Sequence, residues 1–266
     1  MISPLPAEEI KRKVRQHYAG RAEHRSCCGG TACCGPAVRE DAAIVSEDPL
    51  TDACCGSSAS LPEAFAGPAL GCGSPLTYAD VRSGETVLDL GSGAGGDILL
   101  AAQQVGPSGR AIGVDMTPEM VWRARGNARR GGVENAEVRL GEIEHLPVSD
   151  ESVDVVISNC VINLIPDKVR AFREAYRVLK PGGRLVIADI VSRGPLLEAI
   201  RKAAGAWAAC VAGAEDEEVY LAMIRDAGFR QVEVVTSTPP VLGKVHSITV
   251  RAEKPAHVPA ISADPS

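Results

Sequence analysis

The chain has few aromatic residues, no long apolar run and no excess of basic charge. Phe, Trp and Tyr make up 3% of its 266 residues, so a cage of aromatic side chains around a substrate is not evident. No apolar stretch approaches the roughly 20 residues that cross a bilayer, so we expect no membrane partner. The formal net charge is -6, whereas a general nucleic-acid binder shows a basic face, so we expect no nucleic-acid partner. The hydrophobic fraction of 45% is enough to build a globular core.

The N-terminus also lacks the basic and apolar segments of a secretory signal, which predicts a cytoplasmic location. In a reducing cytoplasm, thiols stay free. The odd number of cysteines, nine, fits this location, because a closed set of disulfides would leave one over. The chain is therefore expected to carry an unusually large number of free cysteine thiols.

Four segments are expected along the chain. They are an N-terminal helix with a Cys-rich mobile arm (1–60), a Rossmann-like cofactor domain (61–195), a C-terminal region (196–254) and a flexible tail (255–266). The helix is predicted over residues 5–20, where Ile10, Val14 and Tyr18 recur at helical spacing and Gly20 can end it.

A regular alternation of strands and helices begins at Glu85. Strands are predicted over 86–90, 111–115, 136–140, 153–158 and 183–189, and helices over 97–105, 118–130 and 167–179, with Thr117 as an N-cap. This order predicts an α/β fold, a mostly parallel twisted sheet with helices on both faces. Mainly helical residues 196–228 and two strands within 230–252 add a small C-terminal α+β region.

A glycine-rich loop after the first of these strands predicts a nucleotide-cofactor site. Gly91, Ser92 and Gly93 lie between a strand and a helix, where glycines permit a tight turn and a close approach of ligand to backbone. Asp115 ends the next strand, where a carboxylate can accept hydrogen bonds from ribose hydroxyls.

Further residues narrow the cofactor. The carboxylate of Asp89 suits a cationic sulfonium with an amino-acid tail better than a pyrophosphate. Met116 can lie against an adenine face, and Glu142 and Ile143 follow the third strand, where an acid and a backbone N–H can read the adenine edge. Together with the turn LKPGG, these features resemble class I S-adenosylmethionine-dependent methyltransferases over residues 84–190. The alternative is a nicotinamide-dependent dehydrogenase, but the usual placement of its glycines is absent.

Three cysteines stand alone in distinct surroundings. Cys160 follows the fourth strand, beside Asn159, at the edge where an open parallel sheet binds its ligand. Cys72 lies in a glycine-flanked loop and Cys210 near the end of a predicted helix. Three thiolates from three segments can converge on one soft trivalent ion. The bland alternative for Cys160 is a small buried hydrophobic residue.

The motifs LGCGSP, VLDLGSGAGGD, VDMTPEM, SNCVINL, LKPGG and CVAGA, in this order, resemble the arsenite S-adenosylmethionine methyltransferases. The resemblance implies that Cys160 and Cys210 bind As(III), with Cys72 as an additional ligand and redox partner. It implies an S-adenosylmethionine site formed by Asp89, Gly91, Ser92, Gly93, Asp115, Met116, Glu142, Ile143 and Asn159. It also implies that the segment 196–254 contributes to arsenic binding.

The paired cysteines Cys27, Cys28, Cys33, Cys34, Cys54 and Cys55 are less specific. The family has one further N-terminal cysteine that cooperates with the Cys72 equivalent, and the sequence does not choose among these six. A zinc site is an alternative, but the usual C-x2-C spacing and a nearby His pair are missing. A thiol-rich arm with no defined role is another.

The resulting hypothesis is a methyltransferase that methylates thiol-bound As(III) for detoxification. Its expected partners are arsenite and methylarsenite, delivered as glutathione or other thiol conjugates, with thioredoxin or glutathione as reductant. Two alternatives stay open: a methyltransferase for another small molecule, and an arsenic-binding or redox protein without turnover.

Overall fold

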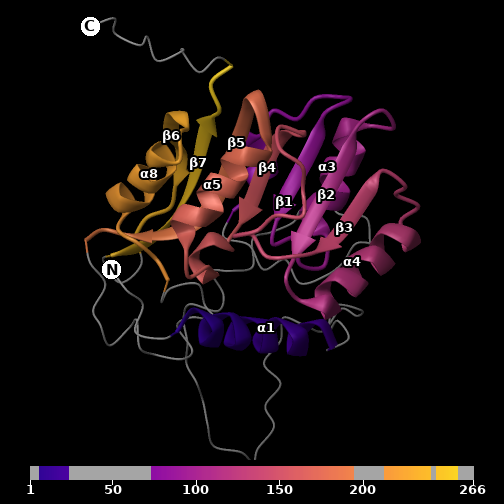
Figure 1. Ribbon diagram of the computed structural model, residues 1–266, viewed down its shortest axis with the longest axis horizontal. Coiled ribbons are helices and arrows are strands. Elements are labelled where there is room, and N and C mark those ends of the chain that lie inside the picture. Colours follow the sequence, from indigo (N-terminus) through magenta and orange to yellow (C-terminus); the bar gives the residue numbers. More distant parts are fainter. Residues whose placement is uncertain (1–5, 24–72, 195–212, 241–243, 257–266) are drawn as a thin grey trace, which may run out of the picture.

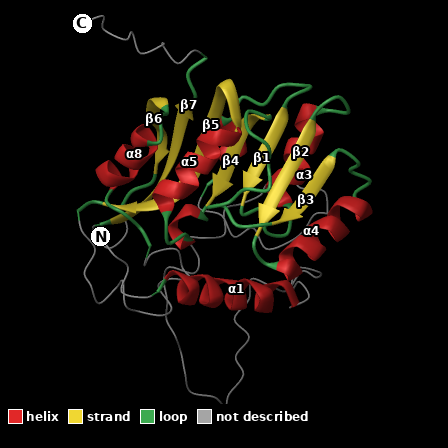
Figure 2. Ribbon diagram, viewed as in Figure 1, coloured by secondary structure: helices red, strands yellow, loops and turns green. Residues whose placement is uncertain are grey.

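A seven-stranded sheet forms the centre of the molecule, in the order β3-β2-β1-β4-β5-β7-β6 (Figures 1 and 2). The computed structural model describes residues 6–23, 73–194, 213–240 and 244–256. The strands are β1 (Thr86–Leu90), β2 (Arg110–Asp115), β3 (Ala136–Leu140), β4 (Val153–Asn159), β5 (Leu179–Ser192), β6 (Arg230–Ser237) and β7 (Val245–Glu253). The five strands from β1 to β5 pair in parallel, and β7 is antiparallel to both β5 and β6.

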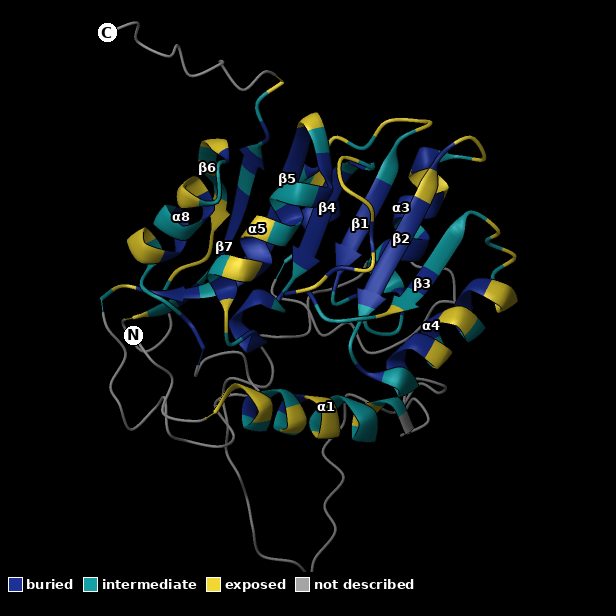
Figure 3. Cartoon of the chain, viewed as in Figure 1, coloured by how far each residue is buried: buried dark blue, intermediate teal, exposed yellow. Residues whose placement is uncertain are grey.

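Helices cover both faces of this sheet, as predicted. They are α2 (Pro75–Tyr78), α3 (Gly96–Val105), α4 (Pro118–Arg130), α5 (Lys168–Val178) and α8 (Glu217–Asp226), with a short 3-10 turn, η2 (Ile162–Leu164). Alternate strand residues face opposite sides. Val87 packs with α2, α3 and α4, whereas Leu88 lies in the cluster formed with α5 and α8. The central strands β1, β2, β4 and β5 are accordingly mostly buried, whereas the outer faces of the helices are exposed (Figure 3).

Helix α1 (Ala7–Glu23) lies apart from these two layers, across the carboxyl ends of the strands (Figure 1). Its apolar side chains Ile10 and Val14 are buried against Cys160 and Leu164. The predicted stop at Gly20 is wrong, because the helix continues for three residues to Glu23. There Arg123 Nη1 donates a hydrogen bond to the Ala22 carbonyl at 3.1 Å, which supplies a partner for the last turn.

The predicted strands and helices between Glu85 and Val178 all occur, with ends that differ by at most one residue. Thr117 occupies the N-cap position of α4, but its side chain makes no capping bond. The fifth strand is longer than predicted. Its pairing jumps from Leu179 to Arg184, so the LKPGG turn is a bulge within the strand. Its far end reaches Ser192 because β7 pairs alongside.

The C-terminal region is joined to the same sheet. Strand β7 pairs with β5 over nine residues, and Phe172 of α5 packs edge-to-face against Tyr220 of α8 at 5.5 Å between ring centroids. The two strands predicted within 230–252 are confirmed as β6 and β7. The division into four segments stays a prediction.

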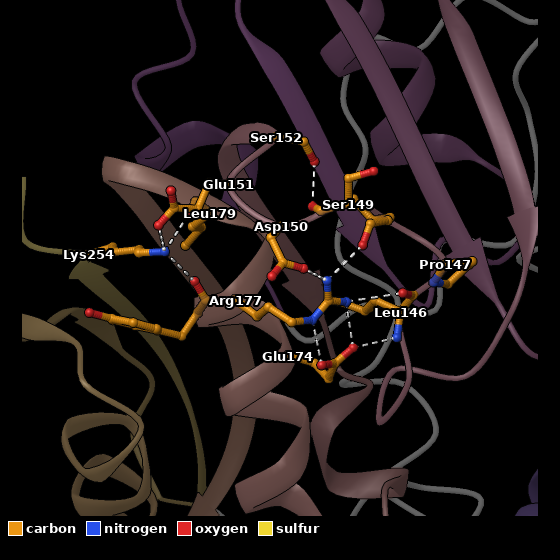
Figure 4. A network of polar contacts seen from close by, with 12 residues as sticks. Leu146, Pro147, Ser149, Asp150, Glu151, Ser152, Glu174, Arg177, Leu179 and Lys254 are labelled. Atoms are coloured by element: carbon orange, nitrogen blue, oxygen red, sulfur yellow. Dashed lines mark hydrogen bonds and ion pairs between the residues drawn. The ribbon is translucent and has the colours of Figure 1, made fainter.

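An arginine network ties α5 to the connection between β3 and β4 (Figure 4). Arg177 Nε lies 2.7 Å from Glu174 Oε1, and Arg177 Nη1 donates to the Val148 carbonyl at 2.9 Å. Nearby, Lys254 Nζ donates to the carbonyl of Leu179 at 2.7 Å, which satisfies main chain at the end of α5 (Figure 4). Within the described residues, no helix is long and apolar enough to cross a bilayer.

Candidate active site

The strand order reverses between β1 and β4, and open α/β sheets bind their ligands at the carboxyl ends of the strands at such a reversal. The chain runs outward from β1 through β2 to β3, then returns to add β4 and β5 on the other side of β1. The glycine loop follows β1 and Cys160 follows β4, so both lie at this reversal.

The glycine loop has the geometry needed for a close ligand approach. Gly91 adopts φ +72° and its N–H bonds to the Val114 carbonyl at 2.8 Å. A Cβ at Gly91 would lie 2.5 Å from Val161 Cγ1, so no other residue fits there without displacement. Gly93 has φ +50°, and its N–H donates to Asp115 Oδ2 at 2.9 Å. Asp115, at the end of β2, thereby holds the loop in place.

Ser92 lies between these glycines and carries a polar atom with no partner among the described residues. Its side chain is buried, and its Oγ makes no hydrogen bond there. Gly113 on β2 provides the space, since a Cβ at that position would lie 2.6 Å from Ser92 Oγ. A buried hydroxyl without a partner is costly, so it fits a loop that gains a polar ligand.

Three carboxylates converge at this loop. Burial raises the pKa of Asp89 well above its ordinary value, and the nearby charges of Asp97 and Asp115 add to the shift. Burial also raises the pKa of Asp97, although a hydrogen bond from Asn159 opposes this. The pKa of Asp115 is raised by burial against hydrogen bonds from Thr117 and Gly93. Crowded, buried carboxylates favour a cationic ligand, as the sequence predicted from Asp89 alone.

Two of the predicted adenine-side residues, Met116 and Glu142, contact α1. Met116 packs against the cluster that contains Ile10 and Cys160. Glu142 is paired with Lys11 of α1, whose Nζ lies 2.6 Å from Glu142 Oε2. Ile143 is buried in the core, so its side chain is part of the packing. Met116 and Glu142 are thus in contact with a helix that lies far away in the sequence.

Cys160 is held in an uncommon backbone conformation at the end of β4. It has φ +59°, in the left-handed region, and its N–H donates to the Ala188 carbonyl at 2.8 Å. Its side chain is buried. A strained non-glycine residue just past a strand is typical of functional sites, because it aims a side chain out of the sheet.

Cys160 is disulfide-bonded, which differs from the expectation that all thiols are free. It is the sole cysteine among the described residues. A disulfide sulfur carries no thiolate, so Cys160 is in its oxidised form in this structure.

The other predicted ligands, Cys72 and Cys210, lie outside the described residues. So do the six paired cysteines, and the zinc alternative for them is untested. In the described part of the chain, no group of three His, Cys, Asp or Glu side chains could hold a metal ion.

Asn159, predicted as a cofactor residue, joins three segments at the strand reversal. Its Nδ2 donates to the Gly73 carbonyl at 2.7 Å and lies 3.3 Å from Asp97 Oδ2. Its Oδ1 accepts a hydrogen bond from the Gly73 N–H at 3.3 Å. The side chain thus links the residue after Cys72 to the helix that follows the glycine loop.

Comparison with known proteins agrees with this geometry. A family model described as a methyltransferase domain matches residues 81–228. The chain is similar to a crystal structure of CrArsM, an arsenic(III) S-adenosylmethionine methyltransferase from Chlamydomonas reinhardtii. Their identity is 34%, the TM-score is 0.66, and the match covers 78% of this chain and 74% of that one. The chain belongs to the arsenite methyltransferase family.

Two curated arsenite methyltransferases are also similar to this chain. That of Halobacterium salinarum is 47% identical over 88% of this chain and 61% of the relative. That of Aquipseudomonas alcaligenes is 39% identical over 73% of this chain and 60% of the relative. The chain thus spans about three fifths of the length of these curated relatives.

The residues at the glycine loop fit S-adenosylmethionine, the methyl donor of this methyltransferase family. The close-approach glycine Gly91, the unpartnered Ser92 Oγ and the acidic group around Asp89 match a cationic sulfonium ligand with polar ends. These residues would hold the donor, which supplies a methyl group from its sulfonium.

Two residues that contact the predicted cofactor residues, Asp97 and Lys11, were not predicted from the sequence. Asp97 is the last residue of the glycine-rich motif VLDLGSGAGGD. It could have been predicted as a site residue, because the sequence shows it as an additional acid in the same motif as Asp89. For Lys11, no pattern in the sequence indicates a contact with the predicted cofactor residues. It is one of several basic residues on an amphipathic helix, and only folding brings it to Glu142 and Glu144, at 2.6 and 3.2 Å.

Proposed function

We propose that this chain transfers a methyl group from S-adenosylmethionine to trivalent arsenic bound by cysteine thiolates. The observation that carries the proposal is the position of Cys160. This buried cysteine follows β4 in a left-handed conformation, at the strand reversal that also holds the glycine loop. The proposed ligands are Cys72, Cys160 and Cys210, and the 47% identical relative is named arsenite methyltransferase.

The proposed reaction is an in-line displacement that needs no general base. The lone pair of thiol-bound As(III) attacks the methyl carbon, an As–C bond forms, and the C–S bond breaks with its electron pair left on sulfur. Alignment is the main task of the protein, and positioning of this kind can supply roughly 7–11 kcal/mol of the barrier. The loop at Gly91 and the strand end at Cys160 are the two parts that must be aligned.

The arsenic becomes formally pentavalent in this step, and we propose that protein thiols reduce it. Two thiols lose two electrons and two protons and become one disulfide, while the arsenic returns to the trivalent state. The disulfide at Cys160 supports a redox role for this cysteine. Thioredoxin or glutathione would then reset it, which requires the reducing cytoplasm proposed as the location of the enzyme.

The decisive experiment combines reduced protein, arsenite, S-adenosylmethionine labelled in its methyl group and excess thiol. We expect labelled methylarsenicals in the product, and loss of at least 100-fold in their rate for Cys160→Ser, because a hydroxyl is a poor ligand for soft As(III). The variant should retain its affinity for S-adenosylmethionine, which calorimetry measures. Binding of arsenite without methylated product would instead indicate a binding or redox protein without turnover.

A carbon methyltransferase is the second candidate. The chain is 31% identical over 185 residues to a ubiquinone/menaquinone C-methyltransferase of an Enterobacter strain, and covers 73% of it. That function does not require a thiol. If a demethylated quinol precursor were methylated at equal rates by the wild-type protein and by Cys160→Ser, this second function would replace the first.

A further inference from the structure

The turn that begins at Cys160 is hydrogen-bonded to three consecutive residues of β5. The Cys160 N–H donates to the Ala188 carbonyl at 2.8 Å. The Asn163 N–H donates to Asp189 Oδ2 at 3.1 Å, and Asn163 Nδ2 donates to the Ile190 carbonyl at 2.6 Å. Cys160, Asn163 and Asp189 are all buried. Because water does not compete for these buried groups, the three bonds fix how the turn lies against the strand.

Asp189 supplies the side-chain acceptor of this set, whereas the other two acceptors are main-chain carbonyls. Its carboxylate is oriented by two further donors, the Ile190 N–H at 2.9 Å and Tyr220 Oη of α8 at 3.2 Å. Val161, at the N-cap of η2, has no polar side chain to offer to the N–H of Asn163. Asp189 therefore does from another strand what an N-cap residue does within its own segment.

The backbone conformation of Cys160 depends on support from both sides. Its φ of +59° is uncommon for a residue with a side chain, and such a conformation persists where the surrounding structure holds it. On one side Asn159 ends β4 and pairs with Ala188 of β5. On the other side η2 begins at Ile162, and the bonds of Asn163 to β5 hold it.

Stability alone does not explain an asparagine at position 163. Its side chain is fully buried, and its Oδ1 has no hydrogen-bond partner among the described residues. A buried acceptor without a partner lowers stability. The amide is therefore better explained by the bond that its Nδ2 makes to β5, which orients the turn after Cys160.

We propose that Asp189 and Asn163 are positioning residues for Cys160. They hold the turn 160–164 against the end of β5 and so keep the Cys160 thiol at the strand reversal that also holds the glycine loop. Neither residue touches the arsenic. This inference rests on the proposed function, in which Cys160 is an arsenic ligand, and it names the residues that orient this ligand.

The first test is the steady-state methylation of arsenite by the reduced full-length chain. We expect Asp189→Ala and Asn163→Ala each to lower kcat at least ten-fold and to leave the KM for S-adenosylmethionine within two-fold. A displaced thiol impairs the alignment needed in the transition state, whereas the glycine loop is unchanged. The two variants remove different bonds to β5, so a folding defect in one leaves the other as the test.

The matched control is Asp154→Ala. Asp154 lies at the amino end of β4, the strand that Cys160 follows. Its Oδ2 also accepts a main-chain hydrogen bond, from the Thr86 N–H at 2.8 Å, and it pairs with Lys180. This variant removes a comparable carboxylate at the opposite end of the sheet and should leave kcat within two-fold.

A second readout does not depend on arsenic. Hydrogen exchange measured by NMR on the reduced chain follows single N–H groups. Asp189→Ala should accelerate exchange at Cys160 and Asn163 at least ten-fold and leave Val156 and Ile157 within β4 unchanged, because the turn opens while the sheet stays paired. A general loss of stability would instead accelerate exchange at all four positions.

Four results would overturn the inference: kcat within two-fold of wild type in both variants, an equal loss in Asp154→Ala, an effect confined to the KM for S-adenosylmethionine, or equal acceleration of exchange throughout β4. If exchange changes as expected but the wild-type chain makes no methylated arsenic, the proposed function fails, while the positioning of Cys160 by Asp189 stands.

Discussion

At the scale of single residues, the carboxylates around the glycine loop determine how the site responds to charge. Asp89, Asp97 and Asp115 are buried near one another, and burial raises the pKa of each. A cationic ligand stabilises their ionised forms. Binding of S-adenosylmethionine should therefore be coupled to the release of protons.

The prediction is that affinity for S-adenosylmethionine rises with pH in the range where Asp89 and Asp97 still hold protons. The protein without donor binds protons that the complex does not, so lowering the pH favours the unliganded form. Calorimetry at one pH in two buffers of different ionisation enthalpy measures the protons released. We expect Asp97→Asn to release fewer, whereas Asp154→Asn, at the amino end of β4, should match the wild-type value. Equal binding enthalpies in both buffers would contradict the coupling.

The residue scale also explains why sequence reasoning identified the loop but not its contacts. Gly91, Gly93 and Asp115 were found because local rules require glycine at positive φ and an acid at a strand end. The hydrogen bonds between Asn159 and Gly73 join residues that are 86 positions apart, and no local rule predicts such a contact.

At the scale of elements, α5 is held by the Arg177 network shown in Figure 4. The hydrogen bonds that Arg177 donates to the carboxylates of Glu174 and Asp150 raise its pKa, so the guanidinium is charged at every accessible pH. It also donates to the carbonyls of Val148 and Leu146, at 2.9 and 3.2 Å. These contacts fix the connection from β3 to β4 onto the helix.

We predict that Arg177→Ala lowers the free energy of unfolding by about 2 kcal/mol, because charged hydrogen bonds to carboxylates and carbonyls are lost together. Urea unfolding measures it. The matched control is Arg110→Ala, which removes an exposed ion pair with Glu137 and should cost less than about 1 kcal/mol. Equal costs for the two variants would show that the network contributes no more than a surface ion pair.

Elements were the best-predicted level of structure between Glu85 and Val178. Helix α4 and strands β1 and β3 have the predicted bounds, since hydrophobic periodicity and Pro or Gly at the ends are local signals. The errors lie where a partner extends an element. Strand β5 reaches Ser192 because β7 pairs with it, and α1 passes Gly20 because Arg123 contacts its last turn.

At the scale of the whole molecule, one buried acid links overall stability to pH. Asp189 of β5 is fully buried, and burial raises its pKa to about 7. The charge of Lys168 opposes the shift, as do hydrogen bonds from Tyr220 Oη at 3.2 Å and the Asn163 N–H at 3.1 Å. Asp189 thus connects β5, α8 and η2.

We predict that stability falls as pH rises through this pKa. An unfolded Asp titrates near 3.9, so between about pH 4 and 7 the folded protein binds a proton that the unfolded chain does not. This stabilisation is complete at low pH and is lost as pH rises through about 7. Between pH 5 and 8 the free energy of unfolding should fall by about 2–3 kcal/mol from this group.

Urea unfolding at several pH values tests this dependence. Asp189→Asn does not titrate, so its stability should vary less with pH than that of the wild-type protein, whatever its absolute value. Parallel pH profiles for the two proteins would show that the carboxyl stays ionised and that its hydrogen bonds outweigh burial.

The amino-acid sequence by itself determined the class of fold, the glycine loop and the cysteine motifs. These follow from local chemistry: the period of apolar residues, the need for glycine at positive φ, and the preference of soft ions for thiolates. The tertiary structure decided which distant side chains meet. It placed Lys11 against Glu142 across 131 positions, joined Asn159 to Gly73, and buried Asp189 among donors from three elements. Such contacts arise only when the sheet and its helices pack, because packing alone brings these groups out of water and within reach of one another.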